Sequence, residues 1–204
     1  MPDRHVLLLH GWRTPQPEHW QLWLAPRLYA RGWEVDFPKL PSADTPVLAE
    51  WLAVVQRRVA RVPRSAELVV VAHCCSALVW MHHAAVLDGR GRRADRVLLV
   101  APPGWNWRHP DLSGLPYPAA DGWSLRRAAG VTRLVVGVGD PWGGVAETSR
   151  LAAALGIEID VVPDGRHLDV EAGFGPWSQA LDWVVDPATA ALNTARRDRP
   201  ADGR

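Results

Sequence analysis

The sequence predicts an α/β fold: a doubly wound, mostly parallel sheet of about six strands with helices on both faces. Short apolar runs alternate along the chain with segments of helical pattern, which is typical of this class. Several of the apolar runs are continuous, as expected for parallel strands that are buried on both faces. The length of 204 residues suits one domain, and a hydrophobic content of 48% can supply its core.

In chain order, each strand is expected where an apolar run occurs, and each helix where the segment between two runs allows it. The predicted strands are residues 5–9, 33–37, 67–71, 96–101, 133–138 and 157–162. The predicted helices are residues 17–30, 46–62, 77–88, 145–155 and 176–185. Prolines begin the first, second and last of these helices, since a first-turn residue needs no N–H partner.

Two stretches do not fit the alternation. Residues 102–130 are rich in Pro, Gly and Trp and are expected to be irregular. They follow the end of a strand, so they should lie over the carboxyl edge of the sheet, where ligands bind in such folds. The domain is expected to span 1–187, followed by a disordered tail at 188–204.

A cysteine pair lies where the strand 67–71 runs into an apolar helix. A nucleophile at a sharp strand-to-helix bend is the nucleophile elbow of α/β-hydrolases. The residues two before and two after the nucleophile crowd each other, so both must be small. Cys74 has Ala72 and Ser76 at these positions. With Cys75 or Ser76 as nucleophile, one neighbour would be a histidine or a leucine, so Cys74 is predicted.

An acid and a base are expected after later strands, in the order nucleophile, acid, histidine. Asp140 follows the strand 133–138, and His167 follows the strand 157–162. Both should emerge at the same sheet edge as Cys74, which predicts a Cys-His-Asp triad. The alternatives are a turn-forming aspartate before Pro141 and a surface histidine.

The predicted oxyanion donors are the backbone N–H groups of Cys75 and Trp12, with Gly11 allowing the backbone to approach closely. Aromatic residues that follow strands suit an apolar acyl pocket. The candidates for its lining are Trp105, Trp107, His109 and Trp142. We expect His19 and Trp20 to anchor a helix.

No metal or cofactor is expected. The histidines and cysteines at positions 73–75, 82 and 83 are close in sequence, but an elbow and a helix would point them in different directions, and no second cluster has a zinc spacing. We expect His82 and His83 to pack within their helix.

The charge and cysteine content restrict partners and location. The net charge of +1 gives no field that favours nucleic acid or an anionic membrane. No apolar run could span a bilayer, and the first residues lack a signal-peptide pattern. Two adjacent cysteines make a poor structural disulfide, which favours a reducing cytoplasm.

The matching motifs extend over most of residues 5–185. They are His10-Gly11-Trp12, Pro17-Glu18-His19-Trp20, Trp23-Leu24, Ala77-Leu78-Val79 after the elbow, Ala101-Pro102-Pro103, Asp140-Pro141, and His167 with the segment 171–177. With these motifs the chain resembles the small α/β-hydrolase family of retinoblastoma-binding protein nine and its bacterial relatives. That family is described as serine hydrolases with a Ser-Asp-His triad. The resemblance implies Cys74, Asp140 and His167 at those positions. The sequence departs from the family at the nucleophile itself, where cysteine replaces serine, and at 72, 76 and 166, where glycine is usual.

Cysteine as nucleophile favours thioester substrates. A thiolate attacks readily but also leaves readily, so an intermediate formed from an unactivated oxyester tends to return to reactants. With a thioester the two leaving groups are matched. The leading prediction is therefore transfer, cyclisation or hydrolysis of an acyl-thioester carried by coenzyme A or a carrier protein, as in natural-product biosynthesis. The alternatives are a carboxylester or lactone hydrolase and a catalytically weak binding protein.

Overall fold

The computed structural model describes residues 3–119, 121–186, 188–189 and 192. Its centre is a six-stranded sheet in the order β2-β1-β3-β4-β5-β6, and each neighbouring pair is parallel. The strands are β1 (Arg4–Leu9), β2 (Glu34–Asp36), β3 (Glu67–His73), β4 (Ala94–Val100), β5 (Ala129–Gly137) and β6 (Glu158–Val162). The predicted doubly wound sheet and its six strands are confirmed.

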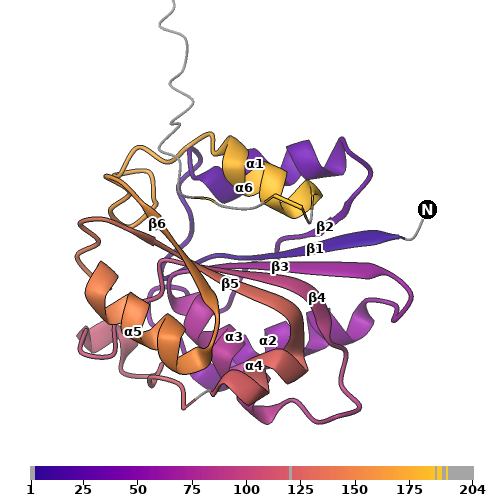
Figure 1. Cartoon of the computed structure of the whole chain (residues 1–204), viewed down its shortest axis with the longest axis horizontal. Helices are drawn as coiled ribbons and strands as arrows, with labels where there is room; N and C mark the ends of the chain where they lie inside the picture. The colour runs from indigo at the N-terminus through magenta and orange to yellow at the C-terminus, as the bar shows by residue number, and fades with distance from the viewer. Residues whose placement is uncertain (1–2, 120, 187, 190–191, 193–204) are drawn as a thin grey trace, which may run out of the picture.

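Helices cover both faces of the sheet (Figure 1). In the described residues they are α1 (Trp20–Tyr29), α2 (Leu48–Arg61), α3 (Cys75–Val86), α4 (Gly122–Ala128), α5 (Val145–Leu155) and α6 (Ser178–Val185), with a short 3₁₀ helix η1 (Pro110–Leu112). Helices α1 and α6 lie together on one face, and α2, α3, α4 and α5 lie on the other. The sheet is therefore shielded from water on both sides, as its apolar strands require.

The central strand β3 shows why the chain forms two hydrophobic cores. Its successive side chains point to opposite faces. Leu68 and Val70 pack into the core beneath α2 and α3, while Val69 and Val71 pack into the core beneath α1 and α6. All four side chains are buried, and each contributes about 1.5–3 kcal/mol through burial.

The stretch expected to be irregular is partly ordered, so that prediction was wrong for residues 110–112 and 122–130. The side chain of Asp121 caps α4 by accepting the backbone N–H of Ser124 at 2.7 Å. Strand β5 then begins at Ala129, four positions before the expected start. The predicted helix starts at 17, 46 and 176 were also too early, because α1, α2 and α6 begin after these prolines. The tail predicted at 188–204 lies largely outside the described residues.

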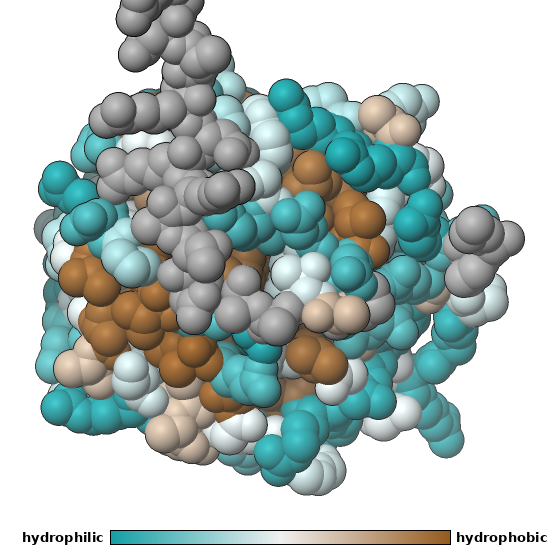
Figure 2. Space-filling model, turned by 45° about the horizontal axis from the view of Figure 1, so that its top comes forward, coloured by the Kyte–Doolittle hydropathy of each residue, from teal (hydrophilic) through white to brown (hydrophobic). Residues whose placement is uncertain are grey.

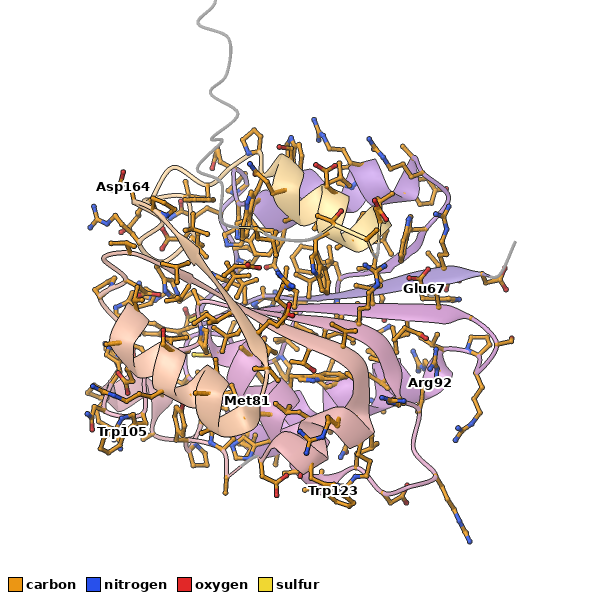
Figure 3. All side chains as sticks on the ribbon, viewed as in Figure 1. Glu67, Met81, Arg92, Trp105, Trp123 and Asp164 are labelled. Atoms are coloured by element: carbon orange, nitrogen blue, oxygen red, sulfur yellow. The ribbon has the colours of Figure 1, made fainter. Side chains whose placement is uncertain are left out.

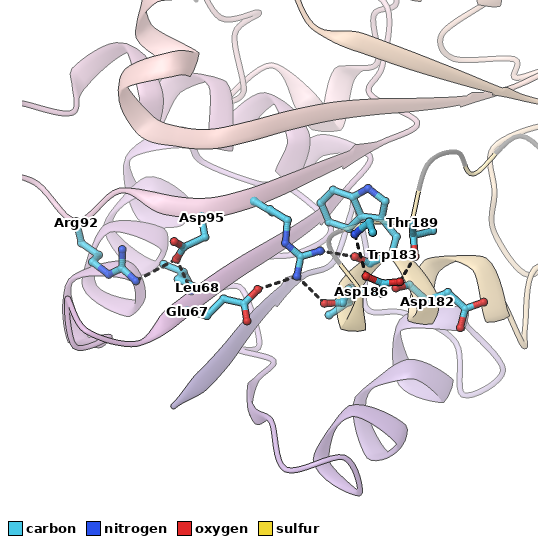
Figure 4. Close-up of polar contacts among 11 residues, drawn as sticks. Glu67, Leu68, Arg92, Asp95, Asp182, Trp183, Asp186 and Thr189 are labelled. Carbon is cyan, nitrogen blue, oxygen red and sulfur yellow. Dashed lines mark hydrogen bonds and ion pairs between the residues drawn. The ribbon is translucent and has the colours of Figure 1, made fainter. Parts of the chain in front are cut away.

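Arg96 attaches the last helix to the sheet. Its guanidinium is buried on β4 and donates to the backbone carbonyls of Trp183 and Val184, which belong to the carboxyl end of α6. It also pairs with Glu67 at the start of β3, at 2.8 Å (Figure 4). One cation thus satisfies helix-terminal carbonyls that have no partner within their own helix.

On the face of the molecule that Figure 2 shows, hydrophobic residues gather in several patches, and hydrophilic residues separate these patches. None of the helices in the described part of the chain combines the length and the apolar character that crossing a bilayer requires.

A buried histidine on α3 should make stability depend on pH. His83 packs against Trp80, with ring centroids 4.9 Å apart, and neither of its ring nitrogens has a hydrogen-bond partner among the described residues. Burial lowers its pKa to about 4 from 6.5. As the pH falls from 6.5 to about 4, the unfolded chain binds a proton at this position and the folded chain does not. Stability from this group is therefore lost in that window, by up to about 1.4 kcal/mol per pH unit.

Between pH 7 and pH 5, the free energy of unfolding of His83→Leu should fall by about 2 kcal/mol less than that of the wild type. Urea unfolding curves at both pH values measure this difference. The matched control is His82→Gln, which changes the neighbouring histidine, whose ring is bonded to the Pro116 carbonyl. Equal pH slopes in the wild type and His83→Leu would show that His83 does not titrate in this way.

Candidate active site

Cys74 occupies the bend between β3 and α3. Its backbone has φ 55° and ψ −124°, a positive φ that side-chain-bearing residues adopt rarely and at a cost. The bend is held in place because the Cys74 N–H donates to the Val100 carbonyl at 2.8 Å, while the Cys74 carbonyl accepts from Ala77 at 3.0 Å. The sharp, strained turn has the geometry of a nucleophile elbow.

The space around this bend is tight. Ala72 and Ser76, which flank Cys74, are both buried, and the Ser76 hydroxyl donates to the carbonyl of His10. On the other side, a Cβ atom added to Gly11 would lie 2.6 Å from the Cys74 Cβ atom. Only glycine therefore allows the loop after β1 to lie against Cys74.

His10 orients the backbone of that loop. Its Nε2 accepts the Leu40 N–H at 3.1 Å, so its Nδ1 carries the proton and donates to the Gly11 carbonyl at 2.8 Å. In a trans peptide the carbonyl and the next N–H point in opposite directions. With the Gly11 carbonyl turned to His10, the N–H of Trp12 faces the Cys74 sulfur. This role of His10 is not evident from the sequence, because the contact with Leu40 forms only in the fold.

Asp140 and His167 meet beyond the ends of β5 and β6. The His167 Nδ1 lies 3.1 Å and 3.0 Å from the two carboxylate oxygens of Asp140, and both side chains are buried. The carboxylate also accepts the Trp142 N–H at 2.9 Å, which fixes its orientation. The pairing with this carboxylate places a proton of His167 on Nδ1.

The second ring nitrogen of His167, Nε2, is available for proton transfer. His167 Nε2 is buried and, apart from its interaction with the Cys74 thiol, has no partner among the described residues. His167 lines the same cavity as Cys74, a hollow of about 230 Å³ that we call the first cavity. The structure thus brings together Cys74, His167 and Asp140 from three separate segments. An imidazole nitrogen beside a thiol can accept and return a proton.

Electrostatics favour an ion pair between Cys74 and His167. The hydrogen bond with Cys75, whose sulfur lies 3.8 Å away, holds the pKa of Cys74 well below its usual range; burial opposes this, and the nearby His167 and the Trp12 N–H add to it. The same hydrogen bond and burial raise the pKa of Cys75. Burial alone would lower the pKa of His167, but the Cys74 thiolate and Asp140 raise it to about 10. A thiolate beside an imidazolium is the reactive form of a cysteine nucleophile.

The expected oxyanion donors come from two separate segments next to Cys74. Trp12 approaches from the loop after β1, as described above. Cys75 is the first residue of α3, where backbone N–H groups have no partner inside the helix. An oxygen that gains negative charge on a carbonyl bound at Cys74 could accept from both groups.

Three of the four predicted pocket residues join an aromatic cluster. This cluster, which we call the aromatic cap, consists of Trp12, Trp107, His109 and Trp142. Trp142 contacts the His167 ring, with centroids 4.0 Å apart, and Trp12 contacts His109 at 4.4 Å. Trp105 is not part of it: its side chain is 56% exposed at the periphery (Figure 3). The expectation that Trp105 lines the pocket beside the nucleophile therefore fails.

Two further histidines contribute to the first cavity. His73 Nε2 bonds the His167 carbonyl at 3.1 Å, and His19 caps α1 by accepting the Gln21 N–H at 3.2 Å. His19 therefore anchors its helix as expected, but it also lines the cavity. Burial lowers the pKa of His19 to about 2 and that of His73 to about 3, so both rings are neutral. Among the described residues, no group of three or more His, Cys, Asp or Glu side chains could hold a metal ion.

A family model described as serine hydrolase matches residues 6–185 of the chain. In sequence, the chain is similar to YdeN of Bacillus subtilis (strain 168), whose name describes it as a hydrolase, with 37% identity over 49 residues. That segment covers 24% of this chain and 26% of YdeN, so the alignment spans about a quarter of the relative.

Solved structures share the fold at low sequence identity. The ydeN gene product of B. subtilis matches with a TM-score of 0.77 and 21% identity, covering 90% of this chain and 97% of that chain. A YdeN-like hydrolase from Pectobacterium atrosepticum matches with a TM-score of 0.68 and 20% identity, covering 94% of each chain. A thioesterase domain from the curacin biosynthetic pathway matches with a TM-score of 0.65 and 14% identity, covering 90% of this chain and 91% of that domain. The fold is that of the α/β-hydrolases.

Proposed function

This chain belongs to the serine hydrolase family, and we propose that it is an acyl-transfer enzyme that uses Cys74 as its nucleophile. Its substrate is an acyl-thioester carried by coenzyme A or a carrier protein, and its products arise by transfer, cyclisation or hydrolysis. The observation that carries the proposal is the placement of Cys74 on the strained elbow, in one cavity with a His167 ring whose Nδ1 is held by Asp140. Within the family, the motifs above favour the group of retinoblastoma-binding protein nine.

The acylation step follows from these groups. The Cys74 thiolate attacks the thioester carbonyl, and the carbonyl oxygen takes the negative charge toward the N–H groups of Trp12 and Cys75. The intermediate collapses by breaking the bond to the substrate sulfur. That sulfur leaves as a thiolate and receives the proton of the His167 imidazolium, which leaves an acyl group on Cys74 and a neutral imidazole.

In the second step His167 acts as a base. Water, an alcohol or an amine gives its proton to Nε2 as it attacks the acyl-cysteine carbonyl, and Cys74 leaves as a thiolate. Asp140 keeps Nε2 directed at the cavity and stabilises the imidazolium that forms. The thiolate–imidazolium pair is thereby restored. A reducing cytoplasm, as expected from the sequence, would keep both cysteines free, and both are free in the structure.

A specific observation also favours a second candidate, a carboxylester or lactone hydrolase. The pKa of His167 is raised to about 10, so an imidazolium is available to protonate an alkoxide that would otherwise be a poor leaving group. A catalytically weak binding protein is the third candidate; stoichiometric acylation of Cys74 would separate it from both enzymes.

The leaving-group preference tests the proposal. We expect the wild type to have a higher kcat/KM for an acyl-thioester than for the matched alkyl oxyester, and Cys74→Ser to move this ratio toward the oxyester by at least about tenfold. The reason is that a serine alkoxide is a poorer leaving group, so its intermediate can expel the substrate alcohol. The ratio compares two transition states on one enzyme and does not depend on a general loss of rate. A wild type that hydrolyses unactivated alkyl esters as fast as thioesters would instead support the ester hydrolase.

A further inference from the structure

A second cavity of about 530 Å³ lies next to the first. Cys75 contributes to its lining, while Cys74 lines the first cavity, and their sulfur atoms are 3.8 Å apart. The segment after β4 forms much of its wall. Its apolar lining comes from Leu78, Trp107, Leu112, Leu115, Tyr117 and nearby prolines.

We propose that the second cavity is the acyl-binding pocket and that it accepts an uncharged aliphatic or aryl acyl group of medium size. The thiol that leaves, and the acceptor that replaces it, would then occupy the first cavity. This inference rests on the proposed function, because it assigns the two halves of a thioester to the two sides of Cys74.

Cys75 connects the cavity to the reacting atoms. Its N–H is the expected donor to the acyl oxygen, and the same residue lines the second cavity. A carbonyl held at Cys74 and directed to this N–H lies close to Cys75, and the second cavity offers space for its acyl substituent there. Trp107 and His109 of the aromatic cap line this cavity and Trp12 and Trp142 line the first, so the cap contributes to both hollows.

The lining favours an uncharged guest. Arg108 is the cation of this lining, and its guanidinium donates to the backbone carbonyls of Trp105 and Trp107. Burial and the nearby Glu147 raise the pKa of Tyr117 to about 12, so its phenol stays neutral. The His109 Nδ1 accepts the Asp111 N–H at 3.2 Å. An acyl chain with a terminal carboxylate would lose its hydration against the apolar side chains that make up most of this lining.

The wall is fixed to the rest of the fold. The Gly114 carbonyl accepts the Leu48 N–H at the start of α2 at 2.9 Å, and the Pro116 carbonyl is bonded to the His82 ring on α3 at 2.9 Å. A Cβ atom at Gly114 would lie 2.7 Å from the Pro46 carbonyl oxygen, so this approach is close. The cavity is thus preformed, and its volume falls within the range of about 300–1,000 Å³ that is usual for small-molecule pockets.

The first cavity offers a different environment. Its lining includes His19, the carboxylate residues Asp169 and Glu171, and Arg13. These polar side chains suit the amide-containing thiol arm of a carrier or a polar acceptor. The contrast assigns the apolar half of the substrate to the second cavity.

The test uses acetyl, hexanoyl and phenylacetyl thioesters of N-acetylcysteamine. Leu115→Trp should fill the second cavity and lower kcat/KM for the two larger acyl groups, relative to acetyl, by at least about tenfold. Leu78→Ala should enlarge it and shift the preference toward the larger groups. The matched control is Leu22→Trp, which adds the same bulk at an exposed position of α1, on the opposite face of the sheet, and should leave the ratios within about twofold. Unchanged ratios in folded Leu115→Trp and Leu78→Ala would overturn the proposal.

A binding experiment separates failure of the pocket from failure of the proposed function. Cys74→Ala cannot form an acyl-enzyme, so hexanamide can be tested as an unreactive acyl probe by ligand-observed NMR. We expect it to bind Cys74→Ala and not the double variant with Leu115→Trp. If no thioester is turned over but this binding pattern is seen, the pocket assignment stands and the acyl-transfer function fails. Binding that Leu115→Trp leaves unchanged would refute the pocket.

Discussion

Cys74→Ala should reduce turnover by at least about 10⁴-fold, while Cys75→Ala should reduce it by no more than about tenfold. The first variant removes the sulfur that forms the covalent intermediate. The second keeps the backbone N–H of residue 75 and removes only the thiol that helps to lower the pKa of Cys74. The rate of Cys75→Ala should therefore recover as the pH is raised, because its Cys74 ionises at higher pH than in the wild type.

Alkylation gives a reading that does not need a substrate. Limited iodoacetamide treatment of the folded wild type, followed by peptide mass spectrometry, should modify Cys74 first. Cys75 should react slowly, since its pKa is raised and its side chain is fully buried. Preferential alkylation of Cys75, together with an active Cys74→Ala variant, would move the nucleophile by one residue and overturn the elbow assignment.

His167→Ala should lower turnover by about 10³–10⁴-fold, the second largest effect expected. It removes both the cation that stabilises the Cys74 thiolate and the base that activates the acceptor. The residual rate should rise with pH between 7 and 9, because losing the imidazolium moves the pKa of Cys74 up toward the value of about 8.5 for an ordinary thiol, while the hydrogen bond with Cys75 remains. Asp140→Asn should cost less than in a serine enzyme, since a thiolate needs less help from the base.

The matched control for this prediction is His109→Ala, which removes a histidine of the aromatic cap and keeps the pair formed by His167 and Asp140. It should retain most of the turnover of a small acyl substrate such as the acetyl thioester. Each substitution removes an aromatic contact, because the His167 ring packs against Trp142 and the His109 ring against Trp12. Folding must therefore be checked, and we expect circular dichroism to show that both variants are folded. Near-normal turnover in His167→Ala would place the base elsewhere, with His109 the next candidate.

The sheet was predictable because its strands carry their own signal. A continuous apolar run such as that of β3 has few alternatives to a strand buried on both faces. Helix α4 was missed, since its seven residues lie in a segment dominated by Pro, Gly and Trp. A signal was present in Asp121 and Ser124, which have the spacing of a helix cap. Three helices were predicted to start too early because the prolines expected as their first residues lie before the helices begin.

The candidate site was predictable where local sterics or chain order decide the position, as for Cys74, Asp140 and His167. Contacts between distant segments could not be foreseen. The role of His10 depends on Leu40, and the place of His19 in the first cavity depends on how α1 packs beside His73. Trp105 and Trp107 are two residues apart, yet one is exposed and the other joins the aromatic cap, because the loop turns between them.

The wide separation of the site residues along the chain has a consequence for biosynthesis. His73 and His167 are in contact through a hydrogen bond that spans 94 positions, and His167 follows β6, an edge strand that is the last to leave the ribosome. Until β6 is synthesised and paired, the nascent chain has Cys74 but no imidazolium beside it. Its thiol then has ordinary acidity and is mostly protonated at neutral pH. The proposed thiolate–imidazolium pair can therefore form only after His167 has been synthesised and has folded against Cys74, which would limit premature acylation and oxidation of the nascent protein.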